Sequence, residues 1–135
     1  MNSHIRYSLI SLVILGMVAF SCKKEEGIGG TSSIKGKVIV RQYNANFTEL
    51  IEQYYATDED VFIIYGDDPV YGDKVTTNFD GTYEFNYLRE GKYKIYAYSK
   101  DSANYPTKHL IPVLVNASIS GKKETIAAKD IVILQ

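Results

Sequence analysis

Residues that could carry out catalysis are few in this chain of 135 residues. It contains two histidines, His4 and His109, and a single cysteine, Cys22. No Gly-x-Ser-x-Gly, His-Glu-x-x-His or phosphate-loop pattern surrounds them, so no nucleophile, zinc ion or nucleotide is placed by a known motif. His109 follows Lys108 at the start of a strand-like run, where an exposed strand-end residue is expected. We therefore expect no enzymatic activity, with a small hydrolase as the remote alternative.

Acidic residues could bind a metal ion, but their spacing matches no known site. They fall in turn-like segments, at Asp58, Glu59, Asp60, Asp67, Asp68, Asp73 and Asp80. Calcium needs about six to eight oxygen ligands from converging loops, and no EF-hand spacing is present. The sequence therefore predicts solvated turns, with no metal and no cofactor.

Tyrosine is the residue type that points to binding, because the chain has 12 tyrosines and no tryptophan. A phenol ring has a flat apolar face and a polar tip, which suits stacking on a sugar or packing against a protein. The candidate ligand-binding residues are Tyr96, Tyr98, Tyr54 and Tyr55. Tyrosine also suits the pleated surface of an ordinary strand, so a purely structural role is the alternative.

The first 21 residues have the pattern of an export signal. His4 and Arg6 precede the uncharged run from Leu9 to Phe20. A helix of this length cannot cross a hydrocarbon core of ~30 Å, but it suits the apolar core of a signal peptide. The run ends at Ala19-Phe20-Ser21, directly before Cys22.

Ala19-Phe20-Ser21-Cys22 resembles the lipobox of bacterial lipoproteins of the Bacteroidetes type. The resemblance implies cleavage of residues 1–21, lipidation of Cys22 with acyl chains such as palmitate, and a lipid anchor in the membrane. An uncleaved signal anchor and a secretory signal with an incidental cysteine are the alternatives. Lys23-Lys24-Glu25-Glu26 is similar to the charged signal that sends such lipoproteins to the cell surface. It implies the outer membrane, lipid-anchored and facing outward, with the periplasmic face as second choice.

The composition and charge of the chain are those of a globular protein, and its length predicts one domain. The chain is 45% hydrophobic and has a formal net charge of −1, which gives no basic excess for nucleic acid binding. Residues 27–33 are rich in glycine and serine, which predicts that residues 22–33 form a flexible tether that starts at the cysteine. The folded domain is expected at residues 34–135.

The elements of this domain follow from alternating apolar residues and turn signals. Asp80-Gly81 between β-prone runs predicts a type I′ hairpin. Tyr83 and Phe85 then alternate with polar residues, and after a break at Gly91 the alternation resumes at Tyr93. We interpret this stretch as a meander of antiparallel strands with one buried face.

Flanking segments complete the expected domain. Further strands are predicted at 34–41, 61–65, 110–119 and 130–134, with Gly36 at a close approach or bulge and Pro112 at an edge or bulge. Apolar residues recur at helical spacing from Phe47 to Ala56 after Asn46, a good N-cap, which predicts a short helix; an ordered loop is the alternative. The fold class expected is an all-β, roughly seven-stranded antiparallel Greek-key sandwich with this one helical insert.

The central stretch resembles the carboxypeptidase regulatory-like domain and its transthyretin-like (prealbumin-like) relatives. The residues that carry the resemblance are Asp80-Gly81-Thr82-Tyr83-Glu84-Phe85, Leu88 and Gly91-Lys92-Tyr93-Lys94-Ile95. The resemblance implies a non-catalytic stalk, adhesive or accessory module, and the transthyretin-related hydrolases use histidines that this chain lacks. Asp80, Gly81, Gly91 and Tyr93 are then structural, with Tyr93 placed like a tyrosine corner.

These observations favour a non-catalytic cell-envelope lipoprotein that acts as a structural or protein-interaction module. The alternative is a carbohydrate-binding accessory lipoprotein that uses exposed tyrosines. The expected partners are the membrane, through the lipid anchor, and a protein or a glycan.

Overall fold

The computed structural model describes residues 25–106 and 108–135, and within them the chain forms strands and no helix. The predicted signal peptide and Cys22 lie outside the described residues. The strands are β1 (Ile28–Tyr43), β2 (Leu50–Tyr55), β3 (Asp60–Tyr65), β4 (Asp73–Thr76), β5 (Thr82–Leu88), β6 (Gly91–Lys100), β7 (Leu110–Ile119), β8 (Thr125–Ala127) and β9 (Ile131–Leu134). In this part of the chain no helix is long and apolar enough to cross a membrane.

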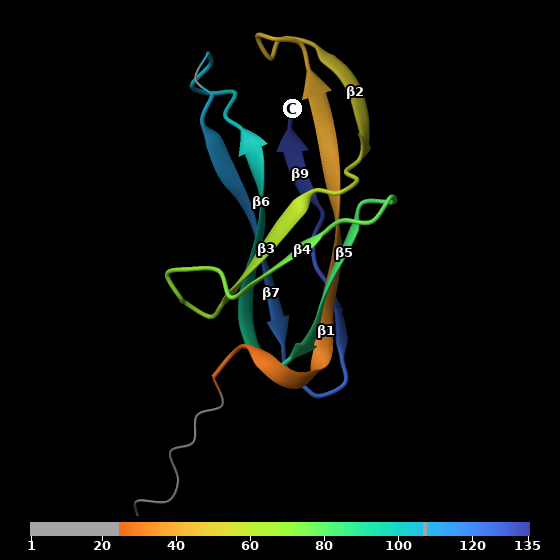
Figure 1. Ribbon diagram of the computed structural model, residues 1–135, viewed down its shortest axis with the longest axis vertical. Coiled ribbons are helices and arrows are strands. Elements are labelled where there is room, and N and C mark those ends of the chain that lie inside the picture. Colours follow the sequence, from red (N-terminus) through yellow and green to blue (C-terminus); the bar gives the residue numbers. More distant parts are fainter. Residues whose placement is uncertain (1–24, 107) are drawn as a thin grey trace, which may run out of the picture.

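Two sheets pack face to face, which confirms the predicted all-β sandwich (Figure 1). In the first sheet, β2, β5, β8 and β9 all pair with the long strand β1, and the second sheet has the order β4-β3-β6-β7. All pairings are antiparallel except those of β8 and β9, which run parallel to β1. The long strand β1 is therefore the central strand of the first sheet, with which every other strand of that sheet pairs.

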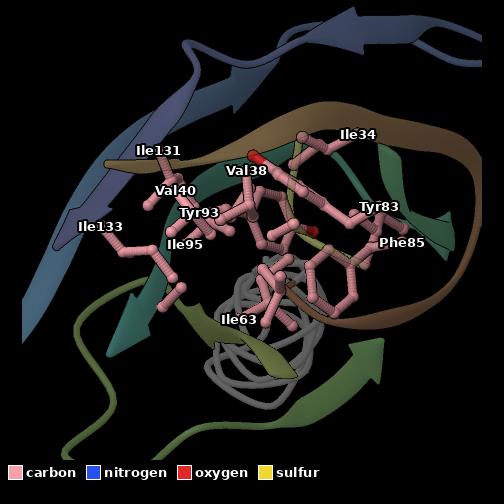
Figure 2. Close-up of a cluster of buried hydrophobic side chains, with 14 of the residues drawn as sticks. Ile34, Val38, Val40, Ile63, Tyr83, Phe85, Tyr93, Ile95, Ile131 and Ile133 are labelled. Atoms are coloured by element: carbon pink, nitrogen blue, oxygen red, sulfur yellow. The ribbon is translucent and has the colours of Figure 1, made fainter. Parts of the chain in front are cut away.

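The core lies between the sheets and is built from alternate residues of each strand (Figure 2). Along β1, Ile34, Val38 and Val40 point inward, because side chains of a strand alternate between its two faces. The other large side chains that are almost fully buried come from both sheets: Ile63, Tyr83, Phe85, Leu88, Tyr93, Ile95, Ile119, Ile131 and Ile133. Gly36 provides the predicted close approach, since a Cβ there would overlap the phenol of Tyr83.

The predicted helix from Phe47 to Ala56 is wrong. Residues 44–49 form a turn in which the Asn44 side-chain oxygen accepts hydrogen bonds from the N–H groups of Thr48 (2.9 Å) and Glu49 (3.2 Å). Residues 50–55 then form β2, which pairs with β1. The apolar residues of this segment lie on both faces of an exposed strand, and their helical spacing has no structural meaning.

The prediction of a flexible tether at residues 22–33 is corrected from Ile28 onward, because β1 begins there. Ser32 and Ser33 are buried, and the Ser33 N–H donates to the Glu124 carbonyl oxygen (2.8 Å). Their partners are distant in the sequence, so a glycine- and serine-rich composition could not reveal them.

The predicted meander is also wrong, because β4, β5 and β6 alternate between the two sheets. Asn78 to Thr82 does form a tight turn, with the Asn78 N–H donating to the Thr82 oxygen (2.8 Å). Of the predicted central pair Asp80-Gly81, only Gly81 has a positive φ, 76°, so the turn is not type I′. This turn carries the chain from one sheet to the other.

Candidate functional site

Four aromatic rings gather on the outer face of the β4-β3-β6-β7 sheet. We call Phe62, Tyr71, Tyr96 and Tyr98 the outer aromatic cluster. Phe62 stacks on Tyr96 with ring centroids 5.0 Å apart and 13° between the planes. Tyr71 and Tyr98 meet Phe62 edge-on at 5.0 and 5.7 Å, and Tyr96 and Tyr98 are 5.5 Å apart.

Strand alternation and register position this cluster. Because Tyr93 and Ile95 point into the core, Tyr96 and Tyr98 on β6 point outward, as the sequence predicted. Phe62 on β3 lies directly opposite Tyr96 in the ladder. On the other side of β6, Leu114 and Pro112 of β7 lie opposite Tyr96 and Tyr98 and extend the apolar surface. Pro112 stands in the edge strand of this sheet, as its missing N–H predicted.

A shallow hollow of about 400 Å³ lies over these strands. It is lined by Ile64, Pro69, Val70, Tyr71, Tyr96, Tyr98, Pro112 and Leu114. The sequence did not place Phe62 or Tyr71 with Tyr96, because Phe62 sits in a continuous apolar run and Tyr71 arrives through the β3–β4 loop. The register of the two strands would have been needed to find them.

Charged side chains surround the apolar surface. Lys74 Nζ lies 3.0 Å from the Asp60 carboxylate and 6.0 Å from the Phe62 ring centroid. Lys94 Nζ donates to Asp67 at 2.8 Å, and this bond lowers the pKa of the Asp67 carboxyl. Both ion pairs are solvent-exposed, so they define the border of the surface and add little stability.

The geometry of the rings limits what this surface can recognise. The stacked faces of Phe62 and Tyr96 are turned toward each other, and Tyr96 is buried. Burial also raises the pKa of the Tyr96 hydroxyl, with a smaller contribution from Tyr98, so this phenol is neutral at physiological pH. The contacting faces of Phe62 and Tyr96 are therefore closed to a sugar, whereas Tyr71 and Tyr98 are exposed rings of the kind that either a protein or a sugar can contact.

A second hollow, of about 510 Å³, lies between the β1–β2 turn and the β6–β7 loop. We call it the distal hollow, because it is at the end of the sandwich opposite the start of β1 (Figure 1). It is lined by Tyr43, Asn44, Ala45, Phe47, Lys100, Tyr105, Pro106, Lys108, Leu110 and Gln135. Phe47 lies between Tyr43 and Tyr105, with ring centroids 6.1 Å from each.

Sequence reasoning missed the distal hollow as a site. Tyr43 is the last residue of β1 and Tyr105 lies in the β6–β7 loop, whereas the sequence predicts a helix at Phe47. In the structure Phe47 has a positive φ of 57° in the β1–β2 turn, and its ring lies beside those of Tyr43 and Tyr105. Aromatic residues in two separate loops were the one available signal, and only the topology shows that these loops meet.

Tyr54 and Tyr55 lie in β2 of the other sheet, away from Tyr96 and Tyr98. They point to opposite faces of β2, and Lys37 Nζ lies 4.4 Å from the Tyr55 ring centroid. The four candidate tyrosines therefore do not form one site.

The residues assigned structural roles lie at turns and between the two sheets. The Tyr93 hydroxyl donates to the Arg89 carbonyl oxygen (2.7 Å) and accepts from the Gly27 N–H (3.1 Å). Burial raises the pKa of this hydroxyl. Gly91 has a positive φ of 146°, and a Cβ there would overlap the Glu26 side chain.

Asp80 stabilises the turn between the two sheets. Its carboxylate accepts hydrogen bonds from the Thr82 hydroxyl (2.9 Å) and N–H (3.2 Å). Lys37 lies 3.4 Å away. The bonds from Thr82 lower the pKa of the Asp80 carboxyl. Gly81 follows with a positive φ and lies against the Val38 oxygen and Tyr55, where a larger residue would collide.

Within residues 25–106 and 108–135, no three His, Cys, Asp or Glu residues are grouped so that they could hold a metal ion. His109 is exposed directly before the start of β7.

No family model matches the chain, and no curated protein matches it. Among solved structures, it is similar to one described as a "putative carbohydrate binding protein" from Pseudomonas aeruginosa. The two chains are 16% identical, and the match covers 81% of this chain and 91% of the other with a TM-score of 0.48.

Proposed function

We propose that this chain is a non-catalytic, lipid-anchored module of the bacterial cell envelope that binds a protein through the outer aromatic cluster. The observation that carries the proposal is the gathering of Phe62, Tyr71, Tyr96 and Tyr98 on the outer face of a sheet whose other face already packs on the core.

The chemistry of the surface supports a protein partner. Val70, Tyr71 and Leu114 are exposed next to one another around the same hollow. Contiguous apolar patches on soluble domains mark interaction sites, and interface centres are enriched in aromatic residues. The Lys74–Asp60 and Lys94–Asp67 pairs provide the polar border that such interfaces have.

Capture of partners from cells tests the protein-binding surface. Full-length chain carrying Tyr71→Ala and Tyr98→Ala should lose a partner that the native chain retains after cross-linking in cell envelopes. The control is Tyr87→Ala, because Tyr87 is 74% exposed on β5 of the other sheet. Equal partner recovery by all three chains would contradict the proposal.

Support for the lipid anchor comes from the sequence Ala19-Phe20-Ser21-Cys22. Metabolic labelling with palmitate should mark the native chain and not a Cys22→Ala variant, and label retained by the variant would rule the anchor out. Protease treatment of whole cells distinguishes the outward face of the outer membrane from the periplasmic face, since only an outward-facing chain is cleaved.

A carbohydrate ligand is the second candidate, and the distal hollow is the observation that favours it. Tyr105 is exposed there, and Asn44, Lys100 and Lys108 add hydrogen-bond donors around the apolar rings. Aromatic rings with nearby polar groups are the usual composition of a small-ligand site. On a glycan array, binding that is lost in Tyr105→Ala but kept in Tyr96→Ala and Tyr98→Ala would assign the ligand to this hollow. An array without any bound glycan would count against it.

A further inference from the structure

Two lysines give the distal hollow a positive charge. Lys100 is the last residue of β6, and Lys108 lies two positions before the start of β7. Both residues line the hollow and are exposed. Within residues 25–106 and 108–135, neither of them forms an ion pair. The hollow therefore contains two ammonium groups that a ligand can reach.

The pairing of β6 with β7 brings the two lysines to the same end of the sandwich. Lys100 lies opposite Leu110 in the ladder. Beyond it, the Asp101 N–H donates to the His109 carbonyl oxygen (3.3 Å). Backbone pairing thus continues to the residue next to Lys108, so the backbone of both lysines is held beside this ladder.

Among the described residues that line the hollow, no side chain is acidic. The nearest acid to Lys100 in the sequence is Asp101, which is only 8% exposed. Its carboxylate accepts hydrogen bonds from the Asn104 side chain (2.6 Å) and the Ala103 N–H (3.0 Å), so its charge is used within its own loop. Even with a carboxylate at Gln135, whose backbone oxygen accepts from the Tyr43 N–H (2.9 Å), two ammonium groups leave the hollow positively charged.

The size and the aromatic rings of the hollow suit a sugar. Its volume of about 510 Å³ lies within the range of small-ligand sites, roughly 300–1,000 Å³. Tyr105 is 50% exposed beside Phe47, with ring centroids 6.1 Å apart, so part of a phenol ring is open to a ligand. An aromatic ring supplies apolar contact area for a sugar, and ammonium groups beside it form charge-assisted hydrogen bonds with a carboxylate.

We propose that the distal hollow binds an acidic saccharide, whose sugar ring contacts Tyr105 and whose carboxylate is bound by Lys100 and Lys108. Uronic and sialic acids are sugars of this class. The ligand belongs to the glycan class given above as the second candidate, on which this assignment rests. Because charge-assisted hydrogen bonds are stronger than neutral ones, the two lysines select an acidic sugar over its neutral counterpart, a distinction that the aromatic rings alone would not make.

Glycan binding by the full-length chain in detergent micelles tests the class of sugar. The probes are oligosaccharides of galacturonic, glucuronic and sialic acid, each as the free acid and as its methyl ester, which lacks the charge but keeps the ring. The free acids should bind at least about tenfold more tightly than the esters, because hydrogen bonds to charged groups are the stronger ones. A higher salt concentration should weaken binding of the acids and leave binding of the esters unchanged.

Substitution of single residues tests the location of the site. Lys100→Gln and Lys108→Gln should each weaken binding of the free acids roughly tenfold and leave binding of the esters unchanged. The matched control is Lys122→Gln, at an exposed position between β7 and β8, which should change neither. Tyr105→Ala should weaken binding of both acids and esters, because it removes ring surface and no charge.

The possible results separate the acidic ligand from the glycan candidate itself. Equal affinity for acids and esters, binding of neutral glycans alone, or equal effects of all three lysine substitutions would overturn the acidic ligand while glycan binding remained. If no glycan bound, both the acidic ligand and the glycan candidate would be wrong. Tighter binding of a polyglutamate peptide than of any acidic saccharide would also overturn the proposal, because the lysines would then serve a protein partner.

Discussion

At the scale of single residues, two buried tyrosines play opposite roles in stability. The Tyr93 hydroxyl has backbone partners at Arg89 and Gly27. The Tyr83 hydroxyl is buried with no hydrogen-bond partner among the described residues, and burial, with a smaller contribution from Asp130, raises its pKa. A buried hydroxyl stabilises a fold only when its hydrogen bonds are made.

Removal of the Tyr93 hydroxyl should destabilise the protein. Tyr93→Phe leaves the Arg89 carbonyl and the Gly27 N–H without their partner, which costs about 1–3 kcal/mol. Urea unfolding measures the loss, and Tyr87→Phe, at an exposed position, should show no change. If Tyr93→Phe were as stable as the native chain, the hydrogen bonds of the Tyr93 hydroxyl would contribute nothing to the free energy of unfolding.

Removal of the Tyr83 hydroxyl should have the opposite sign. Tyr83→Phe deletes a polar atom that is desolvated without compensation, so the free energy of unfolding should stay the same or rise by up to about 1 kcal/mol. The same urea experiment measures it. A loss similar to that of Tyr93→Phe would mean that the hydroxyl has a partner after all.

Asp80 should make stability depend on pH in the acidic range. The Thr82 hydrogen bonds lower the pKa of its carboxyl in the folded state, so the fold favours the ionised form. This contribution is present above the unfolded-state pKa of about 4 and is lost as the pH falls through the lower folded-state value.

The variant Asp80→Asn should therefore lose less stability than the native chain between about pH 5 and about pH 2.5. Unfolding in urea at several pH values measures the difference. Asp68→Asn is the control, because Asp68 is an exposed residue of the β3–β4 loop. If the free energy of unfolding depended on pH in the same way in the native chain and in Asp80→Asn, the Asp80 carboxylate would not contribute to the stability of the turn.

At the scale of elements, the sequence predicted where most strands are, but not how they are joined. Alternation identified β5 and β6 and the outward position of Tyr96 and Tyr98, because side-chain alternation is local. Asp80-Gly81 suggested a hairpin, yet β4 and β5 belong to different sheets. Partner choice depends on contacts between distant segments, as for residues 28–33 in β1 and 50–55 in β2. The distal hollow could not be predicted for the same reason, because it lies where two segments far apart in the sequence meet.

Gly36 shows how closely β1 and β5 pack, and Gly36→Ala should destabilise the sandwich. The added methyl group would overlap the Tyr83 phenol, and overpacking of this kind costs about 1–3 kcal/mol. Because the hydroxyl is the nearest atom, Tyr83→Phe should recover part of the loss. A double-mutant cycle by urea unfolding measures this coupling, and strictly additive effects would contradict the contact.

At the scale of the whole molecule, the chain closes its core with its last strand. β9 pairs in parallel with β1 and places Ile131 and Ile133 between the sheets (Figure 2). Residues far apart in the sequence thus meet in one core, and folding requires both ends of the domain. The fold is therefore expected to unfold as one unit.

A substitution that weakens the packing of β9 should lower the free energy of unfolding of the entire sandwich. Ile133→Ala leaves a cavity in the core and should cost about 2–5 kcal/mol, while Val132→Ala, on the outer face of the same strand, should cost clearly less. Thermal unfolding followed by circular dichroism should show one transition at a lower temperature for Ile133→Ala. A separate early transition would mean that β9 unfolds independently.

The early start of β1 also sets how far the domain can stand from a membrane. Ile28 follows Cys22 by only six positions, and an extended chain of that length spans at most about 20 Å. An acylated Cys22 would therefore keep the β5–β6 end of the sandwich near the lipid headgroups and direct the distal hollow away from them. If Cys22 is acylated as proposed, a partner of the outer aromatic cluster would itself have to come close to the bilayer.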